Sequence, residues 1–204
     1  MSMIRTLLIS LGVLVSNCGV TLAEVQTGKD APDFVLTDTN GKTHHLSDYK
    51  GKYVVLEWYQ PDCPFVRKHY NSGNMQTLQK EYVSKGVVWL SIDSSAAGQE
   101  GNYPSDQLNQ IATKTGSART ALLLDPDGKV GHLYGAKTTP DMYIINPQGI
   151  LVYQGAIDDK PSTDLGDVKT AKNYVKTALN AVMAGQTVAT TSTRPYGCSV
   201  KYAR

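Results

Sequence analysis

The chain has 204 residues, 41% of them hydrophobic, which is enough to bury an ordinary core in one domain with additions. Its formal net charge is only +2. This small charge gives no electrostatic reason to expect binding to nucleic acid or to an anionic membrane surface.

Residues 1–23 have the pattern of a secretory signal peptide. Arg5 is followed by an apolar run over residues 7–15 that is too short to span a bilayer, and residues 21–23 suit a cleavage site. A buried N-terminal helix is the alternative. Cleavage would place the mature chain in the periplasm or outside the cell, without a stable membrane span.

Cysteine usage is compatible with such an oxidising compartment. Cys18 would be discarded with the signal peptide, and lipidation of Cys18 is an alternative that Asn17 before it disfavours. The mature chain would then carry two cysteines, Cys63 and Cys198, where disulfides are permitted.

Residues 28–52 predict a short entry hairpin. A strand near residues 34–36 is followed by a tight-turn signal and a segment that pairs back through His44 and His45. Neighbours on a strand point to opposite faces, so these two histidines would not converge on one ion. We expect surface histidines here, and the sequence predicts no metal or other cofactor.

Residues 53–59 form an almost unbroken run of β-branched and aromatic side chains, which predicts a central strand buried on both faces. Pro61 interrupts the strand, and Pro64 suits the first turn of a helix. Cys63 therefore lies at the N-terminal tip of a helix. The unpaired N–H groups there, with Arg67 one turn along, favour its thiolate, which makes Cys63 a candidate nucleophile.

The remaining periodicities predict alternating helices and strands. The helix after Cys63 breaks at residues 72–74 and then resumes; His69, more than a turn and a half beyond Cys63, is expected to face away from it and to be partly exposed. Further strands are predicted at 86–93, 121–124, 142–145 and 150–154, with helices from 105 and over 169–184. This order predicts an α/β fold.

Residues 186–204 form a threonine- and serine-rich arm that carries Cys198. A frayed tail is one interpretation of this composition. The tyrosines and the cysteine near its end indicate instead that the arm docks on the domain predicted for residues 26–185.

The segment around Cys63 resembles the active-site strand, loop and helix of the thioredoxin-like superfamily. More narrowly, it is similar to the redoxin group, the alkyl-hydroperoxide-reductase and thiol-specific-antioxidant (peroxiredoxin-like) type of domain. Cys63 matches the nucleophilic first cysteine of a Cys-x-x-Cys pattern, and Val66 stands where the second would be. The resemblance covers roughly residues 28–184 and implies a thioredoxin-like fold, with a central mixed β-sheet flanked by helices.

The same resemblance implies further site residues. Thr139 and Pro140 match the threonine and cis-proline that open a strand beside the active cysteine. Glu57 matches the buried carboxylate beneath the thioredoxin site, where it would accept a proton through water; the alternative is a strand carboxylate paired with a nearby lysine.

Two classes of function follow. The first is an extracytoplasmic oxidoreductase with Cys63 as nucleophile, acting by thiol–disulfide exchange with an external partner protein or by slow thiol-dependent reduction of a small peroxide. Peroxiredoxins carry threonine or serine where this chain has Gln60, so fast peroxide reduction is not implied. The second is a non-catalytic module, a scaffold or a copper-handling protein, although Tyr59 replaces the first cysteine of such copper chaperones.

Cys198 is predicted to be the resolving or structural disulfide partner of Cys63. The arm is long enough to cross the face of a small domain, and Gly197 gives its backbone the freedom to turn into the site. A buried free thiol that packs the tail is the alternative.

Overall fold

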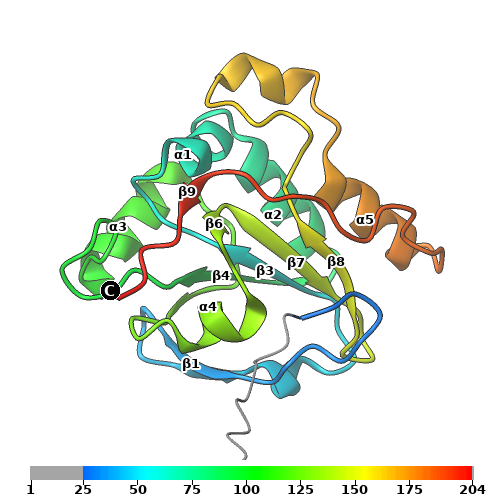
Figure 1. Cartoon of the computed structure of the whole chain (residues 1–204), viewed down its shortest axis with the longest axis horizontal. Helices are drawn as coiled ribbons and strands as arrows, with labels where there is room; N and C mark the ends of the chain where they lie inside the picture. The colour runs from blue at the N-terminus through cyan, green and yellow to red at the C-terminus, as the bar shows by residue number, and fades with distance from the viewer. Residues whose placement is uncertain (1–24, 204) are drawn as a thin grey trace, which may run out of the picture.

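A computed structural model describes residues 25–203 of the chain, so the predicted signal peptide and Cys18 lie outside the described residues. Within the described part, the central sheet has seven strands (Figure 1). They are β1 (Val35–Asp38), β2 (Thr43–His45), β3 (Val54–Trp58), β4 (Val88–Asp93), β5 (Ala121–Leu124), β7 (Asp141–Ile145) and β8 (Leu151–Gly155). Their order across the sheet is β2-β1-β5-β4-β3-β7-β8.

The sheet is mixed, as predicted. Strands β3, β4 and β5 run parallel, whereas β7 is antiparallel to β3 and β1 is antiparallel to β5. Parallel neighbours require crossover connections, and helices supply them here. The helices are α1 (Pro64–Asn71), α2 (Asn74–Val83), α3 (Ser105–Thr115), α4 (Lys129–Tyr134) and α5 (Tyr174–Met183), with short 3-10 turns η1 (Leu46–Tyr49) and η2 (Leu165–Lys169).

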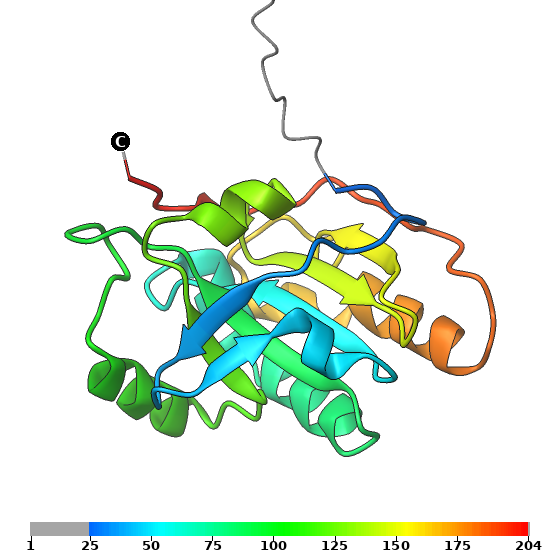
Figure 2. The ribbon, with the colours of Figure 1, turned by 90° about the horizontal axis from the view of Figure 1, so that it is seen from below.

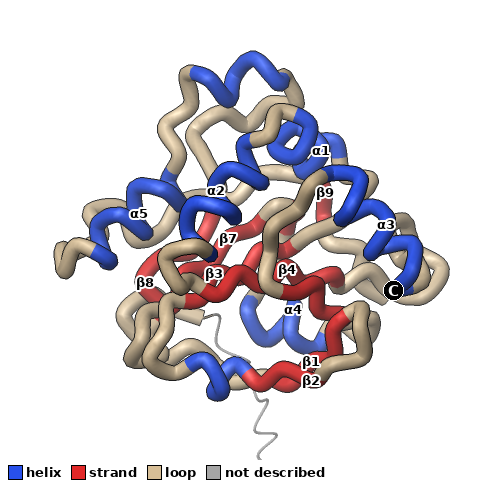
Figure 3. The backbone as a smooth tube through the Cα atoms, turned by 180° about the vertical axis from the view of Figure 1, so that it is seen from behind, coloured by secondary structure: helices blue, strands red, loops and turns tan. Residues whose placement is uncertain are grey.

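Helices cover both faces of the sheet. Helices α1, α2, α3 and α5 lie on one side and α4 lies on the other (Figures 1 and 3). Successive residues of β3 point to opposite faces, so Val55 packs with the α1, α2 and α5 side while Leu56 and Trp58 pack with Tyr134 of α4. Both faces of β3 are buried, which explains its continuous run of apolar residues.

Two local expectations need correction. The predicted helix over residues 169–184 begins only at Tyr174, because the Asn173 side chain accepts a hydrogen bond from the N–H of Lys176 (2.8 Å) and caps the helix there. His44 is not a surface residue. It is 4% exposed, with Asp38 2.9 Å from its ring nitrogen, while His45 is exposed as expected.

The C-terminal arm crosses the molecule beside the end of the sheet where Cys63 lies (Figure 1). It leaves α5, runs past β8 and β7, and reaches the start of α1 (Figures 1 and 2, red). There β9 (Cys198–Ser199) pairs antiparallel with β6 (Thr138–Thr139). Among the helices of residues 25–203, none has the length and apolarity needed to cross a membrane.

Candidate active site

Cys63 lies where the central strand β3 gives way to helix α1. The strand ladder ends as the N–H of Tyr59 donates to the Ile92 carbonyl (2.9 Å), and the Cys63 carbonyl accepts the first helical hydrogen bond, from the N–H of Arg67 (2.9 Å). Cys63 is thus the N-cap of α1, with Pro64 at the next position. This position directs the partial positive charge of the helix terminus towards the thiol.

Gln60 holds the loop that presents Cys63. Both its backbone carbonyl and its side-chain oxygen accept hydrogen bonds from the N–H of Cys63. Gln60 itself is only 3% exposed. The sequence does not predict this structural role. It shows only that Gln60 replaces the threonine or serine of peroxiredoxins.

Thr139, the residue before Pro140, lies directly against the thiol. The bond between Thr139 and Pro140 is cis, as predicted, and the Thr139 carbonyl is 3.0 Å from Cys63 Sγ. Cys63 is 1% exposed and Thr139 is 2% exposed. The thiol therefore lies beneath the surface, in contact with backbone from another part of the chain.

Cys198 approaches Cys63 from the arm. The two sulfur atoms are 2.9 Å apart, both as free thiols. Gly197, with φ +147°, permits this approach, because a Cβ atom there would lie 2.0 Å from the Thr139 carbonyl oxygen. Cys198 is half-buried, whereas Cys63 is buried beneath it. Cys198 is therefore the more accessible sulfur of the two.

The surroundings keep Cys198 protonated. Burial raises its pKa well above the usual thiol range, and the neighbouring sulfur of Cys63 raises it further, because a charge on one sulfur opposes ionisation of the other. Lys201 opposes this rise only in part. Cys63 is the sulfur at the N-cap of α1, whereas Cys198 lies on the arm.

The arm is anchored on both sides of Cys198. Before it, the Thr193 hydroxyl oxygen accepts a hydrogen bond from the N–H of Ala156 (2.9 Å). After it, the Tyr202 hydroxyl donates to the Ala136 carbonyl (2.8 Å). These contacts, together with the β6–β9 pairing, confirm the expectation that the arm docks, so the alternative of a frayed tail is wrong.

Glu57 is completely buried on the face of β3 that α1 and α2 cover. Its carboxylate accepts hydrogen bonds from four side chains, and within residues 25–203 none of these bonds involves a lysine or Cys63. The donors are Tyr70 (3.0 Å), Gln79 (3.3 Å), Trp89 (2.8 Å) and Ser91 (2.8 Å). The alternative of a lysine pair is therefore wrong, and the carboxylate holds α1, α2 and β4 together behind the site.

The guanidinium of Arg67 is paired with neighbouring groups. Its guanidinium forms an ion pair with Asp62 (2.5 Å) and donates to the Pro61 carbonyl (3.0 Å). Slightly more than half of the side chain is exposed, at 55%. Its contacts thus fasten the loop before Cys63, while Asp62 offsets much of its charge.

Asp141 is a buried carboxyl beside the site that sequence inspection did not select. It follows Pro140 directly and is 2% exposed. Burial raises its pKa to about 7, although the N–H groups of Lys137 and Met142 lower it in part. The only signal for this residue was its place after the threonine–proline pair.

This shifted pKa predicts a pH-dependent stability. An unfolded aspartate has a pKa near 3.9, so folded Asp141 retains a proton between about pH 4 and pH 7. The stabilisation associated with that bound proton is lost as pH rises through this window. We expect the unfolding free energy of Asp141→Asn to rise relative to wild type by about 1.4 kcal/mol per pH unit there. Denaturant unfolding from pH 4.5 to pH 8 measures this, and a constant difference would contradict the prediction.

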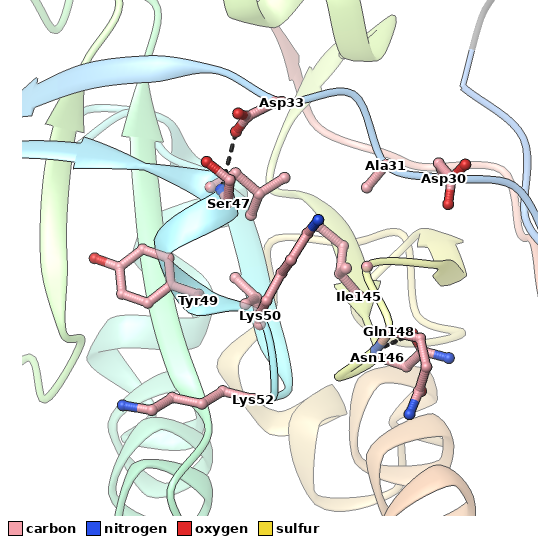
Figure 4. Close-up of a pocket in the computed structure, with 13 residues that line it drawn as sticks. Asp30, Ala31, Asp33, Ser47, Tyr49, Lys50, Lys52, Ile145, Asn146 and Gln148 are labelled. Carbon is pink, nitrogen blue, oxygen red and sulfur yellow. Dashed lines mark hydrogen bonds between the residues drawn. The ribbon is translucent and has the colours of Figure 1, made fainter.

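Two of the cavities in the described part of the chain lie at opposite ends of the sheet. One, of about 290 Å³, is lined by Val54 and Ile145, at the end of the sheet opposite Cys63, and by Lys50 and the hydrogen-bonded pair of Asp33 and Ser47 (Figure 4). The other, of about 620 Å³, lies alongside the arm and the β6 edge. Its lining includes Thr138, Asp158, Tyr174, Arg194, Tyr196 and Gly197. The second cavity thus lies next to Cys198, and a further cavity, of about 560 Å³, is lined by Pro61, Asp62 and Arg67 next to Cys63.

Comparison with known sequences identifies a matching family model and several relatives of the chain. The sequence model of the AhpC/TSA family matches residues 27–154. Thiol-disulfide oxidoreductase ResA of Bacillus subtilis is 30% identical over 135 residues, which cover 63% of this chain and 66% of that protein. ResA of Geobacillus kaustophilus is 33% identical, with 58% of this chain and 75% of that protein covered. The chain thus spans about two thirds to three quarters of these relatives.

Solved structures show the same architecture. An uncharacterized conserved protein from Geobacillus kaustophilus is 27% identical, with a TM-score of 0.72, and covers 87% of this chain and 93% of its own. A hypothetical protein from Sinorhizobium meliloti has a TM-score of 0.74 at 24% identity, covering 89% of this chain and 97% of its own. A putative thiol:disulfide interchange protein DsbE from Chlorobium tepidum shares the thioredoxin-like fold. Its TM-score is 0.53 at 24% identity, and the match covers 64% of this chain and 85% of that protein.

Proposed function

The chain belongs to the AhpC/TSA family of thiol-based redox proteins, and we propose that it is an extracytoplasmic thiol–disulfide oxidoreductase in which Cys63 is the nucleophile and Cys198 resolves the mixed disulfide. The observation that carries the proposal is the 2.9 Å separation of the two sulfur atoms at a helix N-terminus. The signal-peptide pattern of residues 1–23 supports the location. The ResA relatives support exchange as the reaction.

The reaction transfers two electrons from the cysteine pair to a substrate disulfide. The Cys63 thiolate attacks one substrate sulfur, the substrate S–S bond breaks, and the first substrate thiolate leaves. Cys198 then gives up its proton and attacks Cys63 Sγ, which breaks the mixed disulfide and releases the second substrate thiolate. The Cys198 proton goes to a leaving thiolate, and the protein is left with a Cys63–Cys198 disulfide.

An external thiol must reduce this disulfide again. Because Cys198 is the more accessible sulfur, we expect the external thiolate to attack it and Cys63 to leave as a thiolate at the helix terminus. A second external thiolate then attacks the sulfur of the first external thiol, which forms an external disulfide and releases Cys198 as a thiol. This chemistry requires two kinds of partner. An external dithiol protein reduces the Cys63–Cys198 disulfide, and a protein disulfide accepts electrons from the reduced cysteine pair.

Thr139 and Pro140 are proposed to line the place where the substrate sulfur meets Cys63. The Thr139 carbonyl already lies against Cys63 Sγ and pairs with the strand that carries Cys198. In the proposed site, Arg67 and Glu57 have structural roles. Arg67 fixes the loop before Cys63 through its ion pair with Asp62. Glu57 connects α1 and α2 to β4 through its hydrogen bonds. Both therefore hold Cys63 in place rather than contact substrate.

Reduction of a small peroxide is the second candidate, because Cys63 is only 1% exposed and a small oxidant needs less movement of the arm. A peroxide would convert Cys63 to a sulfenic acid, and Cys198 would displace water to form the same disulfide. Gln60 uses its side-chain oxygen to hold the Cys63 N–H, so its amide oxygen is not free to orient the peroxide. We therefore expect this reaction to be the slower one.

The proposal is tested by oxidising reduced protein with a protein disulfide, with glutathione disulfide and with hydrogen peroxide, each at the same concentration. We expect Cys63 and Cys198 to be lost together, two thiols per chain, and the fastest reaction to be with a disulfide. Faster reaction with peroxide would favour peroxide reduction. No reaction with any of the three would favour a non-catalytic scaffold or copper-handling module.

A further inference from the structure

A buried group of charged and polar side chains connects α1 with the C-terminal arm. We call it the Tyr196 cluster, and it consists of Lys68, His69, Asp158 and Tyr196. Lys68 and His69 follow Cys63 on α1, Asp158 lies after β8, and Tyr196 precedes Cys198 by two residues. The expectation that His69 is partly exposed was wrong, since its side chain is completely buried.

The charges in the cluster compensate each other. Lys68 is 1% exposed, which is rare for lysine unless the ammonium group is paired. Its Nζ donates to the Lys160 carbonyl (2.7 Å) and lies 3.9 Å from an Asp158 carboxylate oxygen. Asp158 is 2% exposed, so this ion pair is shielded from water and from salt.

Tyr196 connects the arm to this pair. Its hydroxyl donates to the Asp158 carboxylate (2.5 Å), and Lys68 Nζ lies 5.6 Å from the centre of its ring. The edge of the ring meets Phe65, two residues beyond Cys63, at 5.8 Å between centroids. The arm is therefore attached to the same helix that begins at Cys63.

His69 adds to the hydrogen bonds of the cluster, in which each group donates to the next, from Asn74 through His69 and Tyr196 to Asp158. The Asn74 amide donates to His69 Nδ1 (2.9 Å), so the ring proton lies on Nε2, which is 3.3 Å from the Tyr196 hydroxyl oxygen. Burial lowers the pKa of His69 to about 4, so the ring is neutral at neutral pH and donates without adding charge. The Tyr196 hydroxyl accepts this hydrogen bond and donates its own proton to Asp158.

We propose that the Tyr196 cluster positions Cys198 over Cys63 and thereby sets the equilibrium between the dithiol and disulfide forms of the pair. This inference rests on the proposed exchange between the two cysteines. The equilibrium constant for closing an internal disulfide depends on how often the two sulfurs meet, which is an effective concentration set by the chain between them. Here both sulfurs belong to segments attached to one buried group, so the cluster keeps this concentration high.

The test uses Tyr196→Phe, which removes one hydroxyl and retains the ring against Phe65. The equilibrium between the Cys63–Cys198 disulfide and a reference dithiol is measured in full-length mature protein at neutral pH. We expect the equilibrium constant for disulfide formation to fall about tenfold, a shift of about 30 mV towards easier reduction. The wild-type constant is measured in parallel.

Tyr82→Phe is the matched control. The Tyr82 hydroxyl also bonds buried groups, Asn180 Oδ1 at 2.8 Å and the Lys176 carbonyl at 3.3 Å, but these join α2 to α5 and not to the arm. We expect this variant to lose some stability and keep the wild-type redox equilibrium. Thermal unfolding of the reduced forms shows how much stability each variant has lost.

The outcomes separate the positioning role from the exchange itself. A disulfide that forms normally in Tyr196→Phe, with an equilibrium constant within twofold of wild type, would overturn the positioning role and leave the exchange standing. Equal losses in Tyr196→Phe and Tyr82→Phe would overturn it as well, because the effect would then follow general stability. Absence of a Cys63–Cys198 disulfide in wild type would refute both proposals.

Discussion

Cys63→Ser is expected to lower the rate of thiol–disulfide exchange by at least about 10³-fold, because a serine hydroxyl does not ionise at neutral pH and no other described thiol lies at the helix terminus. Cys198→Ser is expected to behave differently. It retains the nucleophile and completes the first attack, but no internal thiol then resolves the mixed disulfide. The two serine variants are therefore matched controls for each other.

The measurement is the rate of reduction of a protein disulfide, followed by intact-mass analysis of the quenched protein. Cys198→Ser should accumulate an adduct on Cys63 that has the mass of the substrate thiol, whereas Cys63→Ser should accumulate none. The assignment of the nucleophile would be refuted if Cys63→Ser exchanged at the wild-type rate. Adducts on Cys198 in the first turnover of fully reduced wild type, before any external thiol is added and with Cys63 unmodified, would reverse the two roles.

The second large effect is on stability. A bond between Cys63 and Cys198 closes a loop of 135 residues. In the chain-entropy model such a loop lowers the entropy of the unfolded state enough to stabilise the fold by roughly 5 kcal/mol. We expect the oxidised wild-type protein to unfold at clearly higher denaturant concentration than the reduced protein.

Denaturant titration of oxidised wild type, reduced wild type and Cys198→Ser measures this difference. The last two should agree closely, because neither contains the bond, and added reductant should bring the oxidised protein to their midpoint. Identical midpoints for all three samples, with the bond shown to be intact in the oxidised one, would contradict the entropy argument. Oxidised and reduced wild type share one sequence, so packing differences between these two samples are small.

Local sequence signals predicted the framework of the site. The apolar run at residues 53–59 and the proline after Cys63 were enough to predict a buried strand followed by a helix that begins at the cysteine. These features depend on backbone preferences of neighbouring residues, which a single sequence displays directly. The cis bond before Pro140 followed from the resemblance to thioredoxin-like domains.

The contacts around the site could not be predicted in the same way. His69 was expected to be partly exposed because helical geometry directs it away from Cys63, yet Asp158 and Tyr196 cover it. Tyr196 is 127 residues away along the chain, and periodicity carries no information over that distance. The burial of Lys68 could not be predicted for the same reason.

Docking of the arm was predicted from its tyrosines and its cysteine, with a frayed tail as the alternative. Its composition suited a mobile tail as well as a docked segment, and Cys198 was a disulfide candidate only because few cysteines remained in the mature chain. The β6–β9 pairing decides in favour of docking, since backbone hydrogen bonds place Cys198 opposite Thr139. The Glu57 network likewise depends on four side chains from different elements.

Peptide mapping of the oxidised protein without reduction tests the central claim most directly. Trypsin should release residues 53–67 and 177–201 as one species joined through Cys63 and Cys198, and reduction should separate them. The account predicts this joined species as the main product after treatment with either a disulfide or a peroxide. Recovery of the two peptides as separate species, with Cys63 oxidised or bound to an external thiol, would contradict it.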